Sequence, residues 1–268
     1  MKNVHLLIVD MQNDFCETQA KGAQLSVAGA NGDAERLAKF IGKNTKKISD
    51  IHATLDSHNT IHVAHPIFWI NSKGDHPGIF SLISADDVKN GVWMTTNPAW
   101  RQRGIDYVTT LARNGRYPLC IWPAHCLISR WGHAIFPCVG EALTKWENDN
   151  FGIVDFCVKG SNFFTENYSV VKADVPDPSD PSTMLNTELI KVLQDADDIL
   201  VSGEALSHCV RNTVVDIADN FGEENIKKLV LLKDTSSSVG GFEKLGDDFV
   251  RDMVKRGMRI SSTTDYFA

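Results

Sequence analysis

Short, continuous apolar runs alternate with amphipathic stretches along the chain. The runs are rich in Leu and β-branched residues, and they show no alternation of apolar and polar positions. That pattern is typical of strands in a parallel sheet with both faces covered. Five runs predict such strands, namely His5–Val9, Ile61–Ala64, Leu119–Trp122, Ile199–Ser202 and Leu229–Leu232. Ile153–Val158 and Met258–Ser261 are weaker candidates, and a further strand is expected before Asp56.

The amphipathic stretches between these runs predict helices. They cover Asp33–Lys43, Asn97–Arg113, Val139–Asn148, Thr187–Asp195, His208–Asn220 and Phe242–Arg256. Alternation of strands with helices of this length implies right-handed crossovers between parallel strands. The predicted fold class is therefore α/β, a three-layer αβα sandwich with a mostly parallel central sheet.

Two stretches do not fit the alternation. Residues 72–96 are irregular and rich in glycine, and residues 174–182 carry prolines too dense for a helix or a central strand. Strand candidates continue on both sides of each stretch, so neither predicts a linker between domains. We expect a single domain over residues 1–268, with an inserted loop and helix excursion at about residues 66–117.

The composition narrows the class of protein. The chain has 268 residues, with 27 Lys and Arg against 34 Asp and Glu, a net charge of −7. A nucleic-acid-binding surface would need an excess of cations. No apolar run approaches the roughly 20 residues needed to cross a bilayer, and Asp10 comes too early for a secretory signal. We expect a cytoplasmic protein without nucleic-acid or membrane partners.

Polar residues follow several predicted strands at the point where each strand ends. They are Asp10, the pair Asp56 and His58, His125 in the segment 122–126, and Cys209 in the segment 207–209. Ligands of open α/β sheets bind at the carboxyl ends of the strands. Taken singly, each residue is more simply a turn, a cap or a structural side chain. Their joint placement at one edge of the sheet predicts a functional site.

Cys209 has the sequence context of a nucleophile. The six cysteines include no C-x-x-C pair, so neither a zinc ribbon nor a redox dithiol is indicated. Ser207 is a good N-cap, which places Cys209 in the first turn of a helix, where the dipole lowers a thiol pKa. The turn at 203–206 supplies amides suited to an oxyanion hole. Lys159 follows a weak strand and is either an ordinary solvated lysine or a group that holds negative charge in place.

Five ordered motifs resemble the cysteine hydrolases of the isochorismatase-like superfamily, and within it the nicotinamidases and pyrazinamidases. They are VDMQNDF at 9–15, DSH at 56–58, WPAHC at 122–126, KG at 159–160 with ENYS at 166–169, and SGEALSHCV at 202–210. The motifs span most of the chain. The resemblance implies an amidohydrolase that converts nicotinamide to nicotinate and ammonia in NAD salvage, and it is compatible with a homo-oligomer.

The resemblance also implies the catalytic residues. It matches Asp10, Lys159 and Cys209 to a triad in which the carboxylate takes the thiol proton, the lysine holds the ionised pair, and the thiolate attacks the amide. It further implies a cis peptide between Glu204 and Ala205, with the amides of Ala205 and Cys209 as the oxyanion hole.

A divalent metal is implied as the cofactor, with zinc preferred and iron or manganese as alternatives. The resemblance assigns as its ligands Asp56, His58 and His125, with waters completing the shell. His62 could be a fourth ligand, and His65 and His76 are nearby competitors. Phe15 and Trp122 match positions that sandwich the aromatic ring of the substrate.

Departures from the family pattern keep other functions open. Ser57 and Asn59 stand where an aromatic residue and proline are common, and the chain between His58 and Trp122 is long. Aromatic residues in this insert most simply pack it onto the body, but it could also be a lid or a subunit contact. The alternatives are a hydrolase of another small amide or N-carbamoyl compound, an isochorismatase-type ether hydrolase, and an inactive binding homologue.

Overall fold

A six-stranded parallel sheet forms the centre of the structure, a computed structural model that describes residues 2–115 and 117–268. Met1, and Arg116 inside the expected excursion, lie outside the described residues. The strands, in spatial order, are β10 (Arg259–Ser261), β9 (Leu229–Leu232), β8 (Asp198–Gly203), β1 (Val4–Val9), β2 (Asp50–Asp56) and β7 (Asp155–Lys159). Every neighbouring pair is parallel. All six residues of β1 are buried, as a strand covered on both faces requires.

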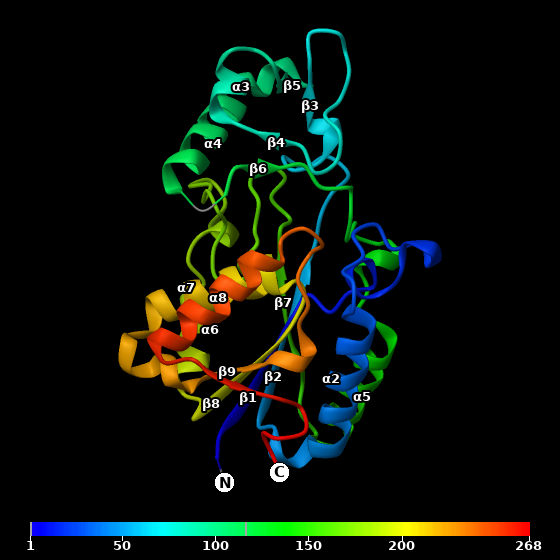
Figure 1. Cartoon of the computed structure of the whole chain (residues 1–268), viewed down its shortest axis with the longest axis vertical. Coiled ribbons are helices and arrows are strands. Elements are labelled where there is room, and N and C mark those ends of the chain that lie inside the picture. The colour runs from blue at the N-terminus through cyan, green and yellow to red at the C-terminus, as the bar shows by residue number, and fades with distance from the viewer. Residues whose placement is uncertain (1, 116) are drawn as a thin grey trace.

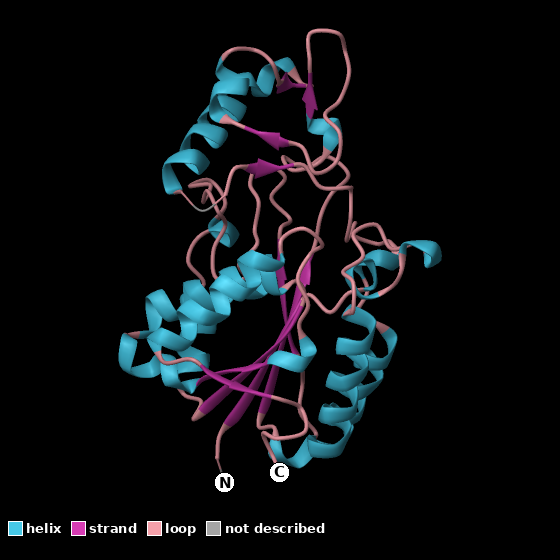
Figure 2. Cartoon of the chain, viewed as in Figure 1, coloured by secondary structure: helices cyan, strands magenta, loops and turns pink. Residues whose placement is uncertain are grey.

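Helices cover the sheet on two sides (Figures 1 and 2). On one side lie α2 (Ala30–Asn44) and α5 (Pro137–Asn150), and on the other α6 (Thr187–Gln194), α7 (Arg211–Phe221) and α8 (Glu243–Arg256). A short helix, α1 (Asn13–Cys16), follows β1. The three-layer α/β fold is therefore confirmed, together with the predicted helices. Among the described residues, no helix combines the length and apolar character needed to cross a membrane.

The chain between β2 and β7 contains an excursion that stands beyond the carboxyl end of the sheet (Figure 1). It holds β3 (Trp69–Ile70), β4 (Leu82–Ile83), α3 (Ala85–Lys89), β5 (Met94–Thr95) and α4 (Arg101–Asn114), with β6 (Leu119–Cys120) next along the chain. β3 pairs with β5 and β4 with β6, both antiparallel. These small ladders are separate from the central sheet.

Aromatic side chains join the excursion to the loop after β7. The ring of Trp100 lies 5.7 Å from that of Phe68 and 5.2 Å from that of Phe164. The Arg103 guanidinium lies 3.5 Å above the Phe164 ring and pairs with Asp177. These contacts agree with the simpler interpretation, in which the insert's aromatic residues pack it onto the body.

Two predicted strands are corrected. Ile61–Ala64 is a loop in which Ile61 is exposed, whereas Val63 and Ala64 are buried outside the central sheet. In Leu119–Trp122 only the two residues of β6 are in a strand, and they pair with β4 outside the central sheet. Pro118 and Pro123 flank this run, and a proline has no N–H to extend a ladder. The strand before Asp56 is β2.

Candidate active site

Four neighbouring strands bring the predicted catalytic residues together. Asp10 directly follows β1, Asp56 ends β2 and Lys159 ends β7. Cys209 lies in a π-helical turn, Leu206–Val210, between β8 and α7. Because the spatial order is β8-β1-β2-β7, their carboxyl ends are adjacent, and residues about 200 positions apart in sequence meet there.

Lys159 is at the centre of this group and is 4% exposed. Its Nζ lies 2.9 Å from Asp10 Oδ2, 3.0 Å from Asp56 Oδ1 and 3.7 Å from Cys209 Sγ. It also donates to the Asn167 carbonyl at 2.9 Å. Burial disfavours its charge, but Asp10 and Asp56 outweigh burial and hold the Lys159 pKa well above its ordinary value. Lys159 is therefore a buried cation rather than a solvated surface lysine.

Burial raises the pKa of the Cys209 thiol well above its ordinary value, and the carboxylates of Asp10 and Asp56 add to that rise while Lys159 opposes it. The expected lowering of the thiol pKa by a helix N-terminus is therefore wrong, because the thiol is buried and lies near two carboxylates. The cap also differs, since the turn begins after Ala205 without a side-chain cap and Ser207 Oγ instead contacts His208 Nδ1 at 2.8 Å.

Asp10 is suited to accept a proton from this thiol. Burial raises its pKa, although Lys159 opposes the shift, and its Oδ1 accepts from Thr54 Oγ1 at 2.5 Å. A carboxylate with a raised pKa beside a protonated thiol is a better match for proton transfer than a strongly acidic one.

The peptide bond between Glu204 and Ala205 is cis, as the resemblance implies. Gly203, just before it, has a φ of 129°, and a Cβ there would lie 2.0 Å from the Val9 carbonyl oxygen. Glycine is required at that position because no side chain fits between the two strands. The Leu206 amide donates to the Ser237 carbonyl at 2.8 Å, which anchors the turn.

A buried cluster beside the lysine could hold a metal. The ligand atoms of Asp56, His58 and His125 lie within 4.8 Å of one another. Nε2 of His58 and of His125 lie 2.9 Å and 3.3 Å from Asp56 Oδ2. The other ring nitrogens contact the carbonyls of Gly160 and Pro123, at 3.2 Å and 2.8 Å. Carbonyls that accept from Nδ1 turn each Nε2 toward Asp56, which is how metal-bound imidazoles are oriented.

The other candidate histidines are placed differently. Both ring nitrogens of His62 contact the backbone, Nε2 with the Thr165 carbonyl at 3.1 Å and Nδ1 with the Ala64 amide at 3.3 Å. The structure thus does not bring His62 into the cluster. His76 contacts the Trp69 carbonyl in the excursion. His65 Nε2 is buried and has no hydrogen-bond partner among the described residues, and its ring lies 5.9 Å from that of His125.

A narrow pocket opens onto Cys209. Its lining combines aromatic side chains with the metal cluster: Phe15, Leu25, Asp56, Trp122, His125, Glu166, Tyr168, Ala205, His208, Cys209 and Val239. The predicted residues Phe15 and Trp122 are both in this wall. Tyr168 and His208 lie in the motifs at 166–169 and 202–210, but no role was predicted for them. Trp122 Nε1 donates to the Tyr168 hydroxyl at 2.9 Å, and the His208 ring lies edge-on to Trp122. A narrow pocket with aromatic walls suits a small planar molecule.

Comparisons with known proteins agree with this architecture. No protein-family model matches the chain. The nicotinamidase of Escherichia coli (strain K12) is 26% identical over 215 residues, 79% of this chain and 74% of that protein.

Solved structures with similar folds include the yeast nicotinamidase bound to nicotinaldehyde, with a TM-score of 0.67 at 14% identity, covering 97% of this chain and 99% of that one. An Acinetobacter baumanii nicotinamidase/pyrazinamidase gives 0.65 at 19% identity, covering 99% and 98%. A Pyrococcus horikoshii pyrazinamidase in complex with zinc gives 0.58 at 19% identity, covering 97% and 99%. At these identities the structural likenesses show a shared fold.

Proposed function

We infer that this chain, a member of the isochorismatase-like superfamily, is a cysteine amidohydrolase that converts a small aromatic carboxamide, first of all nicotinamide, to its acid and ammonia. The observation that carries the inference is the meeting of Cys209, Lys159 and Asp10 at an aromatic pocket, with Lys159 Nζ 3.7 Å from Cys209 Sγ. The related nicotinamidases support the substrate class.

In the first half of the reaction, Asp10 takes the thiol proton and Cys209 Sγ attacks the amide carbonyl carbon. The amides of Ala205 and Cys209 are proposed to stabilise the oxyanion of the tetrahedral intermediate. Asp10 then delivers its proton to the leaving nitrogen, the C–N bond breaks and ammonia departs, leaving a thioester on Cys209.

Water completes the reaction. Asp10 accepts a proton from the attacking water, the C–S bond breaks, and the proton returns to the thiolate as the free acid leaves. Lys159 stays protonated throughout, because both carboxylates beside it favour its charge. Its role is to stabilise the ionised form of the Asp10 and Cys209 pair.

The donor set of Asp56, His58 and His125 fits a divalent ion, and zinc is the first choice, with iron or manganese compatible. A zinc complex of a structural neighbour supports that choice. When bound, the ion would orient the substrate's ring nitrogen or make a bound water more acidic. His65, with its unpartnered Nε2, is better placed than His62 to face that site.

A different small amide is the alternative substrate. The long excursion is the remaining reason to consider it. Ser57 no longer supports it, because its Oγ contacts His133 Nε2 at 2.7 Å and Ser57 is not among the lining residues. The excursion reaches the pocket wall through Phe80, whose ring lies 5.8 Å from that of Trp122. We also propose that residues 1–268 form one domain that includes this excursion.

The test is release of ammonia from nicotinamide by the metal-loaded chain. Cys209→Ala is expected to lose at least about 10³-fold in kcat, because no other group can form the thioester. The matched control is Cys157→Ala on the edge strand β7, which should keep its activity within about twofold.

Two results would contradict the proposal. A zinc-loaded wild type that releases no ammonia from nicotinamide but hydrolyses ring-free amides would favour the alternative substrate. A Cys209→Ala variant as active as Cys157→Ala would exclude the cysteine mechanism.

A further inference from the structure

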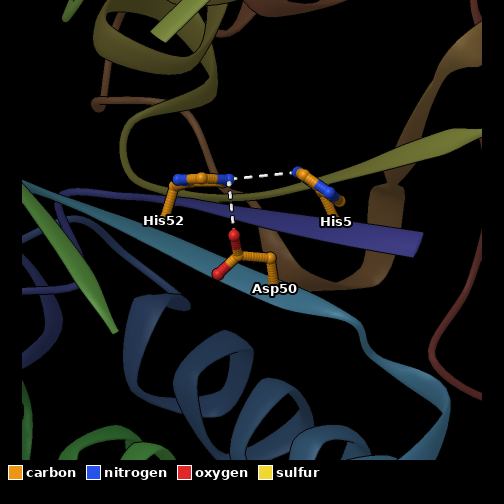
Figure 3. A group of neighbouring side chains, drawn as sticks. All are labelled: His5, Asp50 and His52. Carbon is orange, nitrogen blue, oxygen red and sulfur yellow. Dashed lines mark hydrogen bonds and ion pairs between the residues drawn. The ribbon is translucent and has the colours of Figure 1, made fainter. Parts of the chain in front are cut away.

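His5, Asp50 and His52 form a second cluster of ligand-type side chains, near the amino end of the sheet (Figure 3). His5 lies on β1, Asp50 and His52 lie on β2, and the parallel register pairs His5 with Asp50. Residues two apart on a strand share a face, and so do residues paired across parallel strands. The three ligand atoms consequently lie within 4.8 Å of one another.

A carboxylate behind the cluster fixes the orientation of one imidazole. Nδ1 of His52 lies 2.9 Å from Oδ2 of Asp155, on the neighbouring strand β7. An ionised carboxylate only accepts hydrogen bonds, so Nδ1 donates and Nε2 of His52 presents a lone pair. The same pairing of carboxylate and imidazole orients histidine ligands behind metal ions.

The lone pair of His52 points at two further ligand atoms. Its Nε2 lies 3.1 Å from His5 Nδ1 and 4.0 Å from Asp50 Oδ2 (Figure 3). Around a tetrahedral zinc with bonds of about 2.0–2.2 Å, ligand atoms are about 3.3 Å apart. The two imidazoles already have that spacing, and the Asp50 side chain, 39% exposed, has room to move inward.

Both imidazoles of the cluster are buried, since His5 and His52 are 5% and 2% exposed. An imidazole binds a metal ion in its neutral form.

We propose that His5, Asp50 and His52 bind a divalent transition-metal ion, best matched by zinc, with water completing the shell, and that this ion ties β1 to β2. The site is distinct from the cluster at Asp56, because Asp56 lies four positions beyond His52 on β2, which is roughly 13 Å of strand. The chain then holds two ions, one at each end of β2.

The experiment is a zinc titration of the full chain, stripped of metal with a chelator, followed by calorimetry and elemental analysis. The wild type is expected to bind two zinc ions. His52→Gln and Asp50→Asn are each expected to bind one ion tightly and to keep the ammonia-releasing activity within about twofold. Asp56→Asn, which removes a ligand at the other end, should keep the ion at His5 and His52.

Cobalt provides a second measurement, because visible absorption reports imidazole and carboxylate coordination directly. The cobalt spectrum of Asp56→Asn is expected to disappear when His52→Gln is added. The proposal is overturned if Asp56→Asn binds no zinc, or if Asp50→Asn binds as many ions as the wild type. If the buried His52→Gln variant fails to fold, the zinc count of Asp50→Asn tests the proposal instead, since the Asp50 side chain is partly exposed.

Discussion

The two ends of β2 carry polar clusters of different character on the same face of the sheet. At the carboxyl end, Asp56 and Lys159 are both buried and lie 3.0 Å apart. At the amino end only the imidazoles are buried, whereas the carboxylates of Asp50 and Asp155 are 39% and 53% exposed. Full charges are thus desolvated at one end only.

This difference implies that the charged groups at the carboxyl end depend on one another, whereas those at the amino end can be replaced singly. A buried charge is tolerated only while its partners remain, so each member at the carboxyl end depends on the others. At the amino end the carboxylates are partly solvated, so no buried full charge there depends on a partner. Substitutions should therefore have large effects at the carboxyl end and small ones at the amino end.

The sharpest test of this contrast is Lys159→Met. It leaves Asp10 and Asp56 facing each other without a cation, so the free energy of unfolding should fall by about 3–5 kcal/mol and the activity should fall by at least about 10³-fold. Urea denaturation at pH 7 and ammonia release measure the two effects. Lys39→Met is the control, because Lys39 and its partner Glu35 are 72% and 62% exposed, and it should cost within about 1 kcal/mol. Equal losses in the two variants would remove the contrast.

An effect of intermediate size is expected when acid protonates His208, which is next to Cys209 in the sequence. Burial lowers the pKa of His208 to about 4. The unfolded state binds a proton below its ordinary value of about 6.5 while the folded state does not, so stability is complete above about pH 6.5 and falls by about 3 kcal/mol as the pH drops to 4.

His208→Phe checks this dependence, since its ring can keep the packing against Tyr117 and Phe242. Urea denaturation between pH 4.5 and 7.5 should give a shallower acid slope for the variant than for the wild type. Parallel slopes would assign the acid sensitivity to other groups.

The smallest effect is expected at the amino end, from Asp155→Asn in the presence of a chelator. The asparagine oxygen can still accept from His52 Nδ1, so the free energy of unfolding should change by no more than about 1 kcal/mol. Denaturation in urea measures it. A loss as large as that of Lys159→Met would show that the two ends are equally interdependent.

The apolar pattern of the sequence was sufficient to predict strands that are buried on both faces, as β1 and β9 are. It was weaker for β2, because Asp50, His52 and Asp56 interrupt the apolar run on one face. The prediction of a strand at Ile61–Ala64 failed for the opposite reason, since its buried residues Val63 and Ala64 lie in a turn outside the central sheet. Burial alone does not distinguish these two environments.

The motifs predicted which residues would lie together at the candidate site, but not the electrostatics of that site. Motif order placed Cys209 and Lys159 at strand ends, but only the packed structure shows that burial raises the thiol pKa. The same limit applies to His62 and His65. Sequence spacing offers both near the metal cluster, and only the hydrogen bonds show that His62 has both nitrogens engaged.

The position of Lys159 on β7 has a consequence for motion. β7 is the last strand in the sheet order, so its backbone pairs with β2 alone, and its other edge has no partner strand among the described residues. Edge strands open more readily than central ones, on the timescale that amide hydrogen exchange detects. Fraying of β7 would withdraw the ammonium from Asp10 and Asp56. Exchange rates along Asp155–Lys159 would then report how often Asp10 and Asp56 momentarily lose their cation.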